Sequence, residues 1–327
     1  MDPRMMHLAQ YVKVPIELNA KPGNKVVIIT DTNMDPLLWQ TVAAVAESRG
    51  VEVSLFLMTP RAAFGIDPTP PISAAVRAAD IMVDMTTRAL GHAAICDEIR
   101  KAGKQAIYMN GATYDILSSG AATADYAAIE QLGQTLMALW TECKEVRVTS
   151  RLGTDLVTRT DGRKGFYMAA RNRWLADGRV LDAAFPDGES GIVPLEGTGE
   201  GIVVWDTTVE QIGLLQEPVK LTVKKGWVVD VEGGAQARQI RELLEQHGDR
   251  NSYNCPAEIS IGTNPKARIT GSMREDKKKW GTSHIAFGTN SEDGGVIRAK
   301  LHIDGLIREP TVSMDGRVVV QDGAIKV

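Results

Sequence analysis

The sequence predicts an α/β protein in two parts, a Rossmann-like α/β domain at residues 1–145 and a β-rich domain at residues 146–327. Short apolar strands alternate with amphipathic helices in the first part. In the second part most segments alternate polar and apolar residues, and glycine turns separate them. A chain of 327 residues also exceeds the usual size of one domain, so two domains are expected.

Each strand of the first domain is expected from a short apolar run. Residues 25–30 form a continuous β-branched run, which is typical of a strand that is covered on both faces of a parallel sheet. The helix expected at 37–49 ends at Gly50, because glycine readily takes the left-handed conformation after a helix. This alternation predicts parallel strands joined by right-handed crossovers. Further strands are expected at 51–58, 80–85 and 105–109, and further helices at 72–79 and 96–102.

The first strand carries no signature of nucleotide binding. Neither a GxGxxG pattern nor a Walker glycine pattern follows it. Asp31 and Asp35 follow the strand instead, and turn and N-cap chemistry is favoured for them over the lining of a pocket. We therefore expect a Rossmann-like domain without a dinucleotide site.

The second domain is expected to follow a long amphipathic helix at 125–143. Its segments of alternating polarity predict mostly antiparallel strands, and one helix is expected at 235–246. The Asp315-Gly316 pair predicts a hairpin between the last two strands. Together the strands predict a curved sheet or barrel. They are expected at 145–150, 156–160, 201–205, 219–223, 227–231, 311–314 and 318–320.

Composition and charge exclude several classes of partner. The formal net charge is −4 and no long basic run occurs, so nucleic acid is not expected as a partner. The lysines at 277–279 are interpreted as a solvated surface turn rather than a phosphate-binding patch. No apolar run approaches the roughly 20 residues that a membrane helix needs. The N-terminus lacks the features of a signal peptide, so a cytoplasmic protein is expected.

The three cysteines predict neither a disulfide framework nor a zinc motif. Cys96, Cys143 and Cys255 are odd in number and lie far apart, without a CxxC pair. We expect them to be reduced and buried.

Imidazole and carboxylate groups gather near the C-terminus. Glu258 and His284 each lie in an apolar, strand-like run, and burying a lone carboxylate there would be costly. His302 and Asp304 flank one residue, so in a strand both side chains project from the same face and can chelate one cation. Each residue alone has a plain structural or solvent-facing interpretation. Together they predict a divalent metal site, without indicating which metal.

Six motifs follow one another in the C-terminal half, from about residue 147. They are GTDL at 153–156, FPDGESGIVPLEGTGEGIVV at 185–204, VKKGWVVDVEGG at 223–234, AEISIGTNP at 257–265, EDKKKWGTSHIAFG at 275–288 and HIDG at 302–305. In these motifs the chain resembles the aminopeptidase T family of metallopeptidases. The resemblance implies an N-terminal α/β domain followed by a β-rich catalytic domain, a homodimer, and two adjacent divalent cations such as Zn, Co or Mn.

By motif position, the resemblance implies five metal ligands: Glu189, Glu258, His284, His302 and Asp304. The implied reaction is hydrolysis of an amide or N-terminal peptide bond by a metal-activated water, in a small molecule or short peptide. Glu189 or Glu258 would then act as the proton shuttle. The family's tyrosine ligand has no counterpart in residues 289–293.

The chain also resembles the 2,5-dihydroxypyridine dioxygenases in its length and its closing HxD motif. That resemblance implies one Fe(II) held by two histidines and an aspartate, and the opening of a hydroxylated pyridine-like ring. His284, His302 and Asp304 would form such a triad, although the position of Glu258 is histidine in that group. Because Glu189, Glu258 and His284 match the peptidases, a metallo-aminopeptidase-like hydrolase is the preferred prediction. The dioxygenase is the alternative, and a non-catalytic binding protein is a third.

Overall fold

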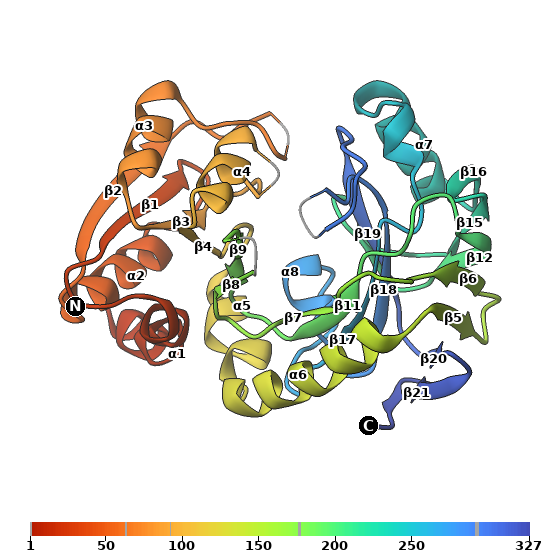
Figure 1. The fold of residues 1–327 in the computed structure, drawn as a ribbon. Coiled ribbons are helices and arrows are strands. Elements are labelled where there is room, and N and C mark those ends of the chain that lie inside the picture. Colours follow the sequence, from red (N-terminus) through yellow and green to blue (C-terminus); the bar gives the residue numbers. More distant parts are fainter. Residues whose placement is uncertain (1, 63, 92, 176–177, 292–293) are drawn as a thin grey trace. The chain divides into compact units, whose positions relative to one another are not determined.

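The computed structural model describes residues 2–62, 64–91, 93–175, 178–291 and 294–327, and Figure 1 shows the course of the chain. The chain divides into two compact units, each built from two segments. The first unit is Met1–Ala124 with Met168–Asp187, and the second is Asp125–Tyr167 with Gly188–Val327.

The boundaries between these units fall after residues 124, 167 and 187, whereas a single boundary after residue 145 was predicted. The long helix α6 (Tyr126–Glu142) belongs to the second unit, because it packs against strand β11 (Glu189–Ile192). Residues 168–187 return to the first unit, where β10 (Ala183–Ala184) adds a strand to the sheet. A two-residue strand carries no periodic pattern, so no local feature of residues 183–184 indicates this return.

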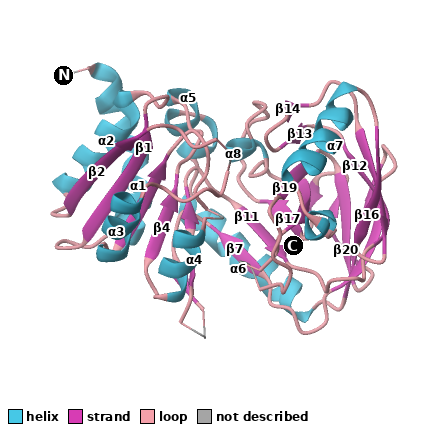
Figure 2. Cartoon of the chain, turned by 90° about the horizontal axis from the view of Figure 1, so that it is seen from above, coloured by secondary structure: helices cyan, strands magenta, loops and turns pink. Residues whose placement is uncertain are grey.

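The first unit contains a five-stranded parallel sheet in the order β10-β4-β3-β1-β2. Helix α2 covers one face of the sheet, and α3 and α4 cover the other (Figures 1 and 2). The central strands β1 and β3 are almost entirely buried, as their apolar sequences predicted. The elements are α1 (Pro3–Asn19), β1 (Lys25–Asp31), α2 (Pro36–Ser48), β2 (Glu52–Met58), α3 (Pro70–Ala78), β3 (Ile81–Met85), α4 (Ala94–Lys101), β4 (Gln105–Tyr108), α5 (Tyr114–Ser118), η1 (Gly120–Thr123), β8 (Arg173–Trp174), β9 (Val180–Leu181) and β10.

Asp31 at the end of β1 and Asp35 after it stabilise turns and a helix start, as predicted. Asp31 accepts hydrogen bonds from the backbone N–H groups of Asn33 and Thr87. Asp35 is the N-cap of α2 and accepts from the backbone N–H of Leu37 at 3.0 Å. These oxygens satisfy N–H groups that would otherwise lack a partner.

The second unit consists mainly of two open sheets around one hydrophobic core. The seven-stranded sheet has the order β14-β13-β19-β18-β17-β11-β7, and the eight-stranded sheet has the order β16-β15-β12-β6-β5-β20-β21-β22. Residues of both sheets, such as Val148 and Ile285, belong to the same buried cluster. The β-rich prediction is therefore confirmed, but the sheets stay open and form no barrel.

The remaining elements of this unit surround the two sheets. Helix α7 packs against β15 and β16, and the short helix α8 lies beside β13. The strands are β5 (Glu145–Ser150), β6 (Asp155–Arg159), β7 (Phe166–Met168), β11, β12 (Glu200–Trp205), β13 (Thr208–Val209), β14 (Gly213–Leu214), β15 (Val219–Lys224), β16 (Trp227–Glu232), β17 (Glu258–Gly262), β18 (Ser283–Gly288), β19 (His302–Ile307), β20 (Pro310–Met314), β21 (Arg317–Gln321) and β22 (Ala324–Ile325), and the helices are α6, α7 (Ala235–His247), η2 (Arg250–Tyr253) and α8 (Met273–Asp276).

Two predictions from composition can be compared with the structure. All three cysteines are buried free thiols, as expected. No helix in the described part of the chain combines the length and the apolar character that crossing a membrane requires.

Candidate metal centre

The five predicted site residues lie on one face of the seven-stranded sheet. Residues that are directly opposite in an antiparallel pair project from the same face, and so do residues two apart in a strand. Opposite pairs join Glu258 to Ala286 and Ala286 to Asp304. His284 lies two residues before Ala286, and His302 lies two before Asp304. Ala286 therefore lies between Glu258 and Asp304 and contributes only a methyl group to this face.

Glu189 reaches the same face from the neighbouring strand. In the pairing of β11 with β17 it lies opposite Gly262, which is four residues after Glu258 and therefore on the same face of β17. The intervening residues of these strands, such as Ile259, Ile285 and Ile303, project from the other face into the hydrophobic core. The alternation of polar and apolar side chains therefore separates the site from the core.

The structure brings the five side chains into two overlapping groups. Glu189, Glu258 and His284 form one group, and Glu258, His302 and Asp304 form the other; within each, one possible ligand atom per residue lies within 4.8 Å of the others. Glu258 is common to both. No group in the described residues joins His284 to His302 and Asp304, so the triad predicted as the dioxygenase alternative is not assembled.

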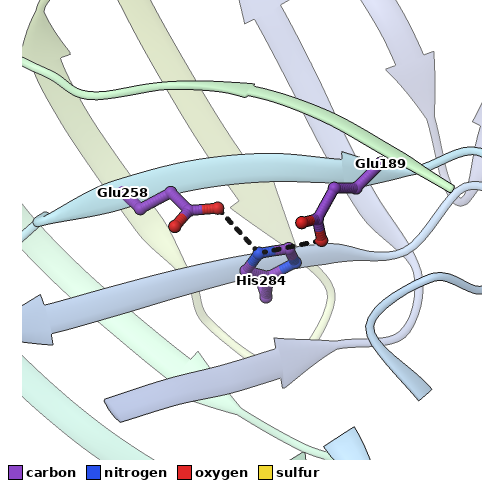
Figure 3. Close-up of side chains that lie close together, drawn as sticks. All are labelled: Glu189, Glu258 and His284. Atoms are coloured by element: carbon purple, nitrogen blue, oxygen red, sulfur yellow. Dashed lines mark hydrogen bonds and ion pairs between the residues drawn. The ribbon is translucent and has the colours of Figure 1, made fainter. Parts of the chain in front are cut away.

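In the first group, His284 lies against both carboxylates. Its Nε2 is 3.0 Å from Glu258 Oε1 and 3.7 Å from Glu189 Oε2, and both carboxylates are directed toward its ring (Figure 3). In the second group, His302 Nε2 is 3.2 Å from Asp304 Oδ1 and 3.7 Å from Glu258 Oε2.

The two histidines differ in the partner of their other ring nitrogen. His302 Nδ1 is 2.8 Å from the backbone oxygen of Thr289 and donates to it. That bond leaves Nε2 as the nitrogen that can bind a metal, in the manner usual for histidine ligands. His284 Nδ1 is buried and has no hydrogen-bond partner in the described part of the chain. Its proton is therefore best placed on Nε2, where it donates to Glu258.

Two lysines complete the cluster, and here the sequence interpretation was wrong. Lys278 Nζ lies 2.8 Å from Glu189 Oε1, and Lys277 Nζ lies 2.8 Å from Asp304 Oδ2. The side chain of Lys278 is 1% exposed and that of Lys277 is 20% exposed. Neither is a solvated surface residue, because the buried carboxylates require compensating positive charge.

The turn that carries these lysines is held by two buried acids of α8. Glu275 forms an ion pair with Arg268 at 3.0 Å. Asp276 accepts hydrogen bonds from Thr270 and Gly271, and from the hydroxyl of Thr208 in β13 at 2.6 Å. These contacts fix the backbone from which Lys277 and Lys278 reach the site.

Neighbouring charges shift the pKa values of Glu189, Asp304 and His302. Burial alone would raise the pKa of Glu189, but Lys278 and Lys277 outweigh it and lower the pKa to about 2. Burial would likewise raise the pKa of Asp304, yet Lys277 and His302 hold it well below its usual value. Burial would lower the pKa of His302, but the carboxylates of Asp304 and Glu258 raise it to about 10. The carboxylates, the two lysines and His302 thus form a network of paired charges.

Sequence reasoning missed one further contributor, Ser260. Its hydroxyl donates to Glu258 Oε1 at 2.6 Å, and it projects from the same face two residues along β17. The strand period would have indicated this contact.

Comparison with known proteins decides between the two families that the sequence resembles. The sequence matches the NicX family model, described as 2,5-dihydroxypyridine 5,6-dioxygenase, over residues 8–327. The chain belongs to this dioxygenase family. A curated relative, the 2,5-dihydroxypyridine 5,6-dioxygenase of Pseudomonas putida KT2440, is 24% identical over 263 residues, which cover 77% of this chain and 72% of the relative.

Two solved structures share the fold. The 2,5-dihydroxypyridine dioxygenase from Pseudomonas putida KT2440 has a TM-score of 0.82 at 20% identity, with 98% of this chain and 97% of that chain covered. Wild-type AmpT from Thermus thermophilus has a TM-score of 0.72 at 15% identity, with 98% and 99% covered. The mixed α/β and sheet-rich fold and its aminopeptidase T-like character are confirmed. These likenesses show the fold alone, and do not test the Rossmann-like description of the first unit.

Membership of the dioxygenase family overturns the preferred functional prediction. The assignment as a hydrolase, with its aminopeptidase and metalloprotease character, is wrong, and the family is one of enzymes with oxygenase chemistry. The hydrolase was preferred because Glu189, Glu258 and His284 match the residue types of the peptidases, and this match was taken to indicate the reaction. Carboxylate and imidazole ligands suit several metals and both kinds of chemistry. The family and the two ligand groups are both compatible with a divalent metal.

Proposed function

We propose that this chain is a metal-dependent, ring-opening dioxygenase for a hydroxylated pyridine-like substrate, with one Fe(II) held by Glu258, His302 and Asp304. The reaction class rests on the family match over residues 8–327. The substrate class is taken from the curated relative, which is a 2,5-dihydroxypyridine 5,6-dioxygenase. Both atoms of O₂ would enter the product, so no separate reductant is required.

The choice of ligands is supported by the partners of the two histidines. His302 donates from Nδ1 to the Thr289 carbonyl and so offers Nε2 to a metal, whereas His284 has no acceptor for a proton on Nδ1 among the residues that the structure describes. The donor set is one imidazole and two carboxylates. It departs from the facial triad of two histidines and one carboxylate, because Glu258 provides an oxygen in place of a nitrogen.

In this proposal the metal supplies the redox chemistry with O₂, and the chain's own residues orient and neutralise the reactants. Lys277 is more exposed than Lys278, so a substrate anion that enters the site meets the Lys277 ammonium. His284 keeps a proton on Nε2 toward Glu258, and Ser260 donates to the same carboxylate. These two bonds restrain Glu258 beside His302 and Asp304.

Oxygen uptake tests the proposal. Protein reconstituted with Fe(II) without oxygen is expected to consume one O₂ for each 2,5-dihydroxypyridine opened, and both atoms of ¹⁸O₂ should appear in the product. The same protein loaded with Zn(II) should be inactive, since zinc has no redox chemistry. Absence of oxygen uptake by the Fe(II) protein across a panel of dihydroxypyridines would refute the reaction class.

Ser260→Ala is expected to weaken Fe(II) binding by about 10-fold, because residues that hydrogen-bond to metal ligands typically contribute that much. The change removes the 2.6 Å bond to Glu258 and little volume. Titration with Fe(II) under anaerobic conditions measures it. Ser283→Ala is the matched control, since the Ser283 hydroxyl is buried and has no hydrogen-bond partner among the described residues. Equal affinities of the two variants would contradict a role for Ser260.

The other expectations remain part of the proposal. The first unit is treated as Rossmann-like without a dinucleotide site, because its parallel sheet carries helices on both faces and the acids after β1 form caps and turns. The homodimer, a small-molecule substrate and the absence of a nucleic-acid partner stay predictions.

A further inference from the structure

The cluster contains more ligand groups than one metal ion needs. Besides Glu258, His302 and Asp304, it holds a second group of Glu189, Glu258 and His284, which shares the carboxylate of Glu258. Two ligand groups joined by one carboxylate are the arrangement of a two-metal site, in which the ions lie about 3.5–4 Å apart. Some feature must therefore distinguish the second ligand group from the first in its ability to bind a metal ion.

The distinguishing feature is how deeply the ammonium group of each group is buried. Lys278 Nζ lies 2.8 Å from Glu189 Oε1 and its side chain is only 1% exposed, whereas Lys277, at the same distance from Asp304 Oδ2, is 20% exposed and so can turn away from its carboxylate when a cation binds. A lysine in this position presents a compact positive charge to the same carboxylate that a second cation would need. The other oxygen, Glu189 Oε2, is buried without a hydrogen bond in the described residues and lies 3.7 Å from His284 Nε2.

The net charge of the cluster also favours binding of one divalent ion over binding of two. The three carboxylates of Glu189, Glu258 and Asp304 face the two ammonium groups of Lys277 and Lys278. One divalent ion makes the cluster singly positive, which a substrate with one ionised hydroxyl would neutralise. A second divalent ion would raise the charge to three in a buried site, where uncompensated charge is expensive.

We infer that Lys278 fills the second cation position of this cluster and thereby limits the site to one metal ion. The inference rests on the proposed function, because it takes Glu258, His302 and Asp304 as the ligands of that one ion. Lys278 acts here through Glu189, as a residue that positions charge. It need not contact the substrate or the metal.

Metal counting on Lys278→Met tests this inference, because methionine keeps the length of the side chain and removes its charge. With Mn(II) as the probe, the unaltered protein is expected to bind one ion per chain and to give the six-line electron paramagnetic resonance spectrum of an isolated ion. Lys278→Met is expected to bind a second ion and to give the spectrum of a coupled pair. The second ion should bind more weakly than the first, since no described residue accepts a hydrogen bond from His284 Nδ1.

The double variant Glu189→Gln, Lys278→Met is the matched control. It removes both members of the ion pair, so it should fold without an uncompensated charge and bind one ion. Lys279→Met, which alters the neighbouring lysine, should also bind one ion. Two ions on the unaltered protein, or one ion on folded Lys278→Met, would overturn the inference.

Folding of the metal-free variant provides a second readout. Lys278→Met leaves Glu189 as a buried carboxylate without its ion-pair partner, so we expect a lower melting temperature that rises again as Mn(II) is added. If only the double variant folds, at every Mn(II) concentration, a metal cannot replace the ammonium and the inference is wrong. None of these results depends on oxygen uptake, so a failure of the dioxygenase assignment would be recognised separately.

Discussion

His302→Ala is expected to lower kcat for oxygen uptake by about 1,000-fold or more, because the metal loses its nitrogen ligand. The His302 Nε2 atom lies 3.2 Å from Asp304 Oδ1 and 3.7 Å from Glu258 Oε2. Among the described residues, no other imidazole belongs to this ligand group. The protein should also lose tightly bound iron. Elemental analysis and oxygen-electrode assays on the same preparation measure both effects.

The fold is expected to survive this substitution, since His302 lies on the polar face of the sheet and not in the hydrophobic core. Circular dichroism establishes that point. His247→Ala is the matched control, because His247 is exposed at the end of α7 and should be replaceable without loss. A His302→Ala protein that retains its iron and a tenth of its activity would exclude His302 as a ligand.

Gly305→Ala should lower the free energy of unfolding by about 3 kcal/mol, at the upper end of the usual cost of overpacking. A Cβ atom at Gly305 would lie only 1.9–2.3 Å from three ring atoms of Trp205. That ring is fully buried, stacks on Phe287 and donates to the Ile285 carbonyl at 3.2 Å, so it has little freedom to move. Because Gly305 follows Asp304 directly, metal affinity should fall as well.

Denaturation in urea measures the change in stability. Gly91→Ala provides the control, since a Cβ atom there would lie 3.6 Å from the Tyr108 ring, an ordinary contact. Similar stability of both alanine variants would show that the Trp205 ring can be displaced at low cost.

The local sequence pattern was sufficient to predict much of the fold. It could not predict the parts that depend on pairing between strands that lie far apart in the chain. The central strands of the first unit follow from continuous apolar runs, and the bounds predicted for helix α7 agree with the structure to within one residue. Glu189 entered the predicted site only through family resemblance, because β11 pairs with β17 about seventy residues later. No local rule identifies such a partner. The same limit applies to β10, which is too short to have a period.

Within the site, the residue types were predictable and their roles were not. In the sequence, Lys277 and Lys278 lie in a polar run that is typical of a solvated turn. Only the positions of Glu189 and Asp304 in the structure explain why the two lysines are buried. His284 and His302 look alike in the sequence. They differ through the Thr289 carbonyl, whose position depends on a loop. The reaction itself could not be inferred from ligands that serve hydrolases and oxygenases alike.

The alternation along β17, β18 and β19 gives this protein two nearly independent sets of positions for engineering. Residues on the polar face, such as Glu258 and His284, belong to the candidate metal site and form the outward set. Their immediate neighbours, such as Ile259 and Ile285, pack in the hydrophobic core and form the inward set. A combinatorial library confined to the outward set should therefore yield mostly folded proteins with altered metal preference or reactivity. A library confined to the inward set should yield variants that differ in thermal tolerance while keeping the same catalytic chemistry.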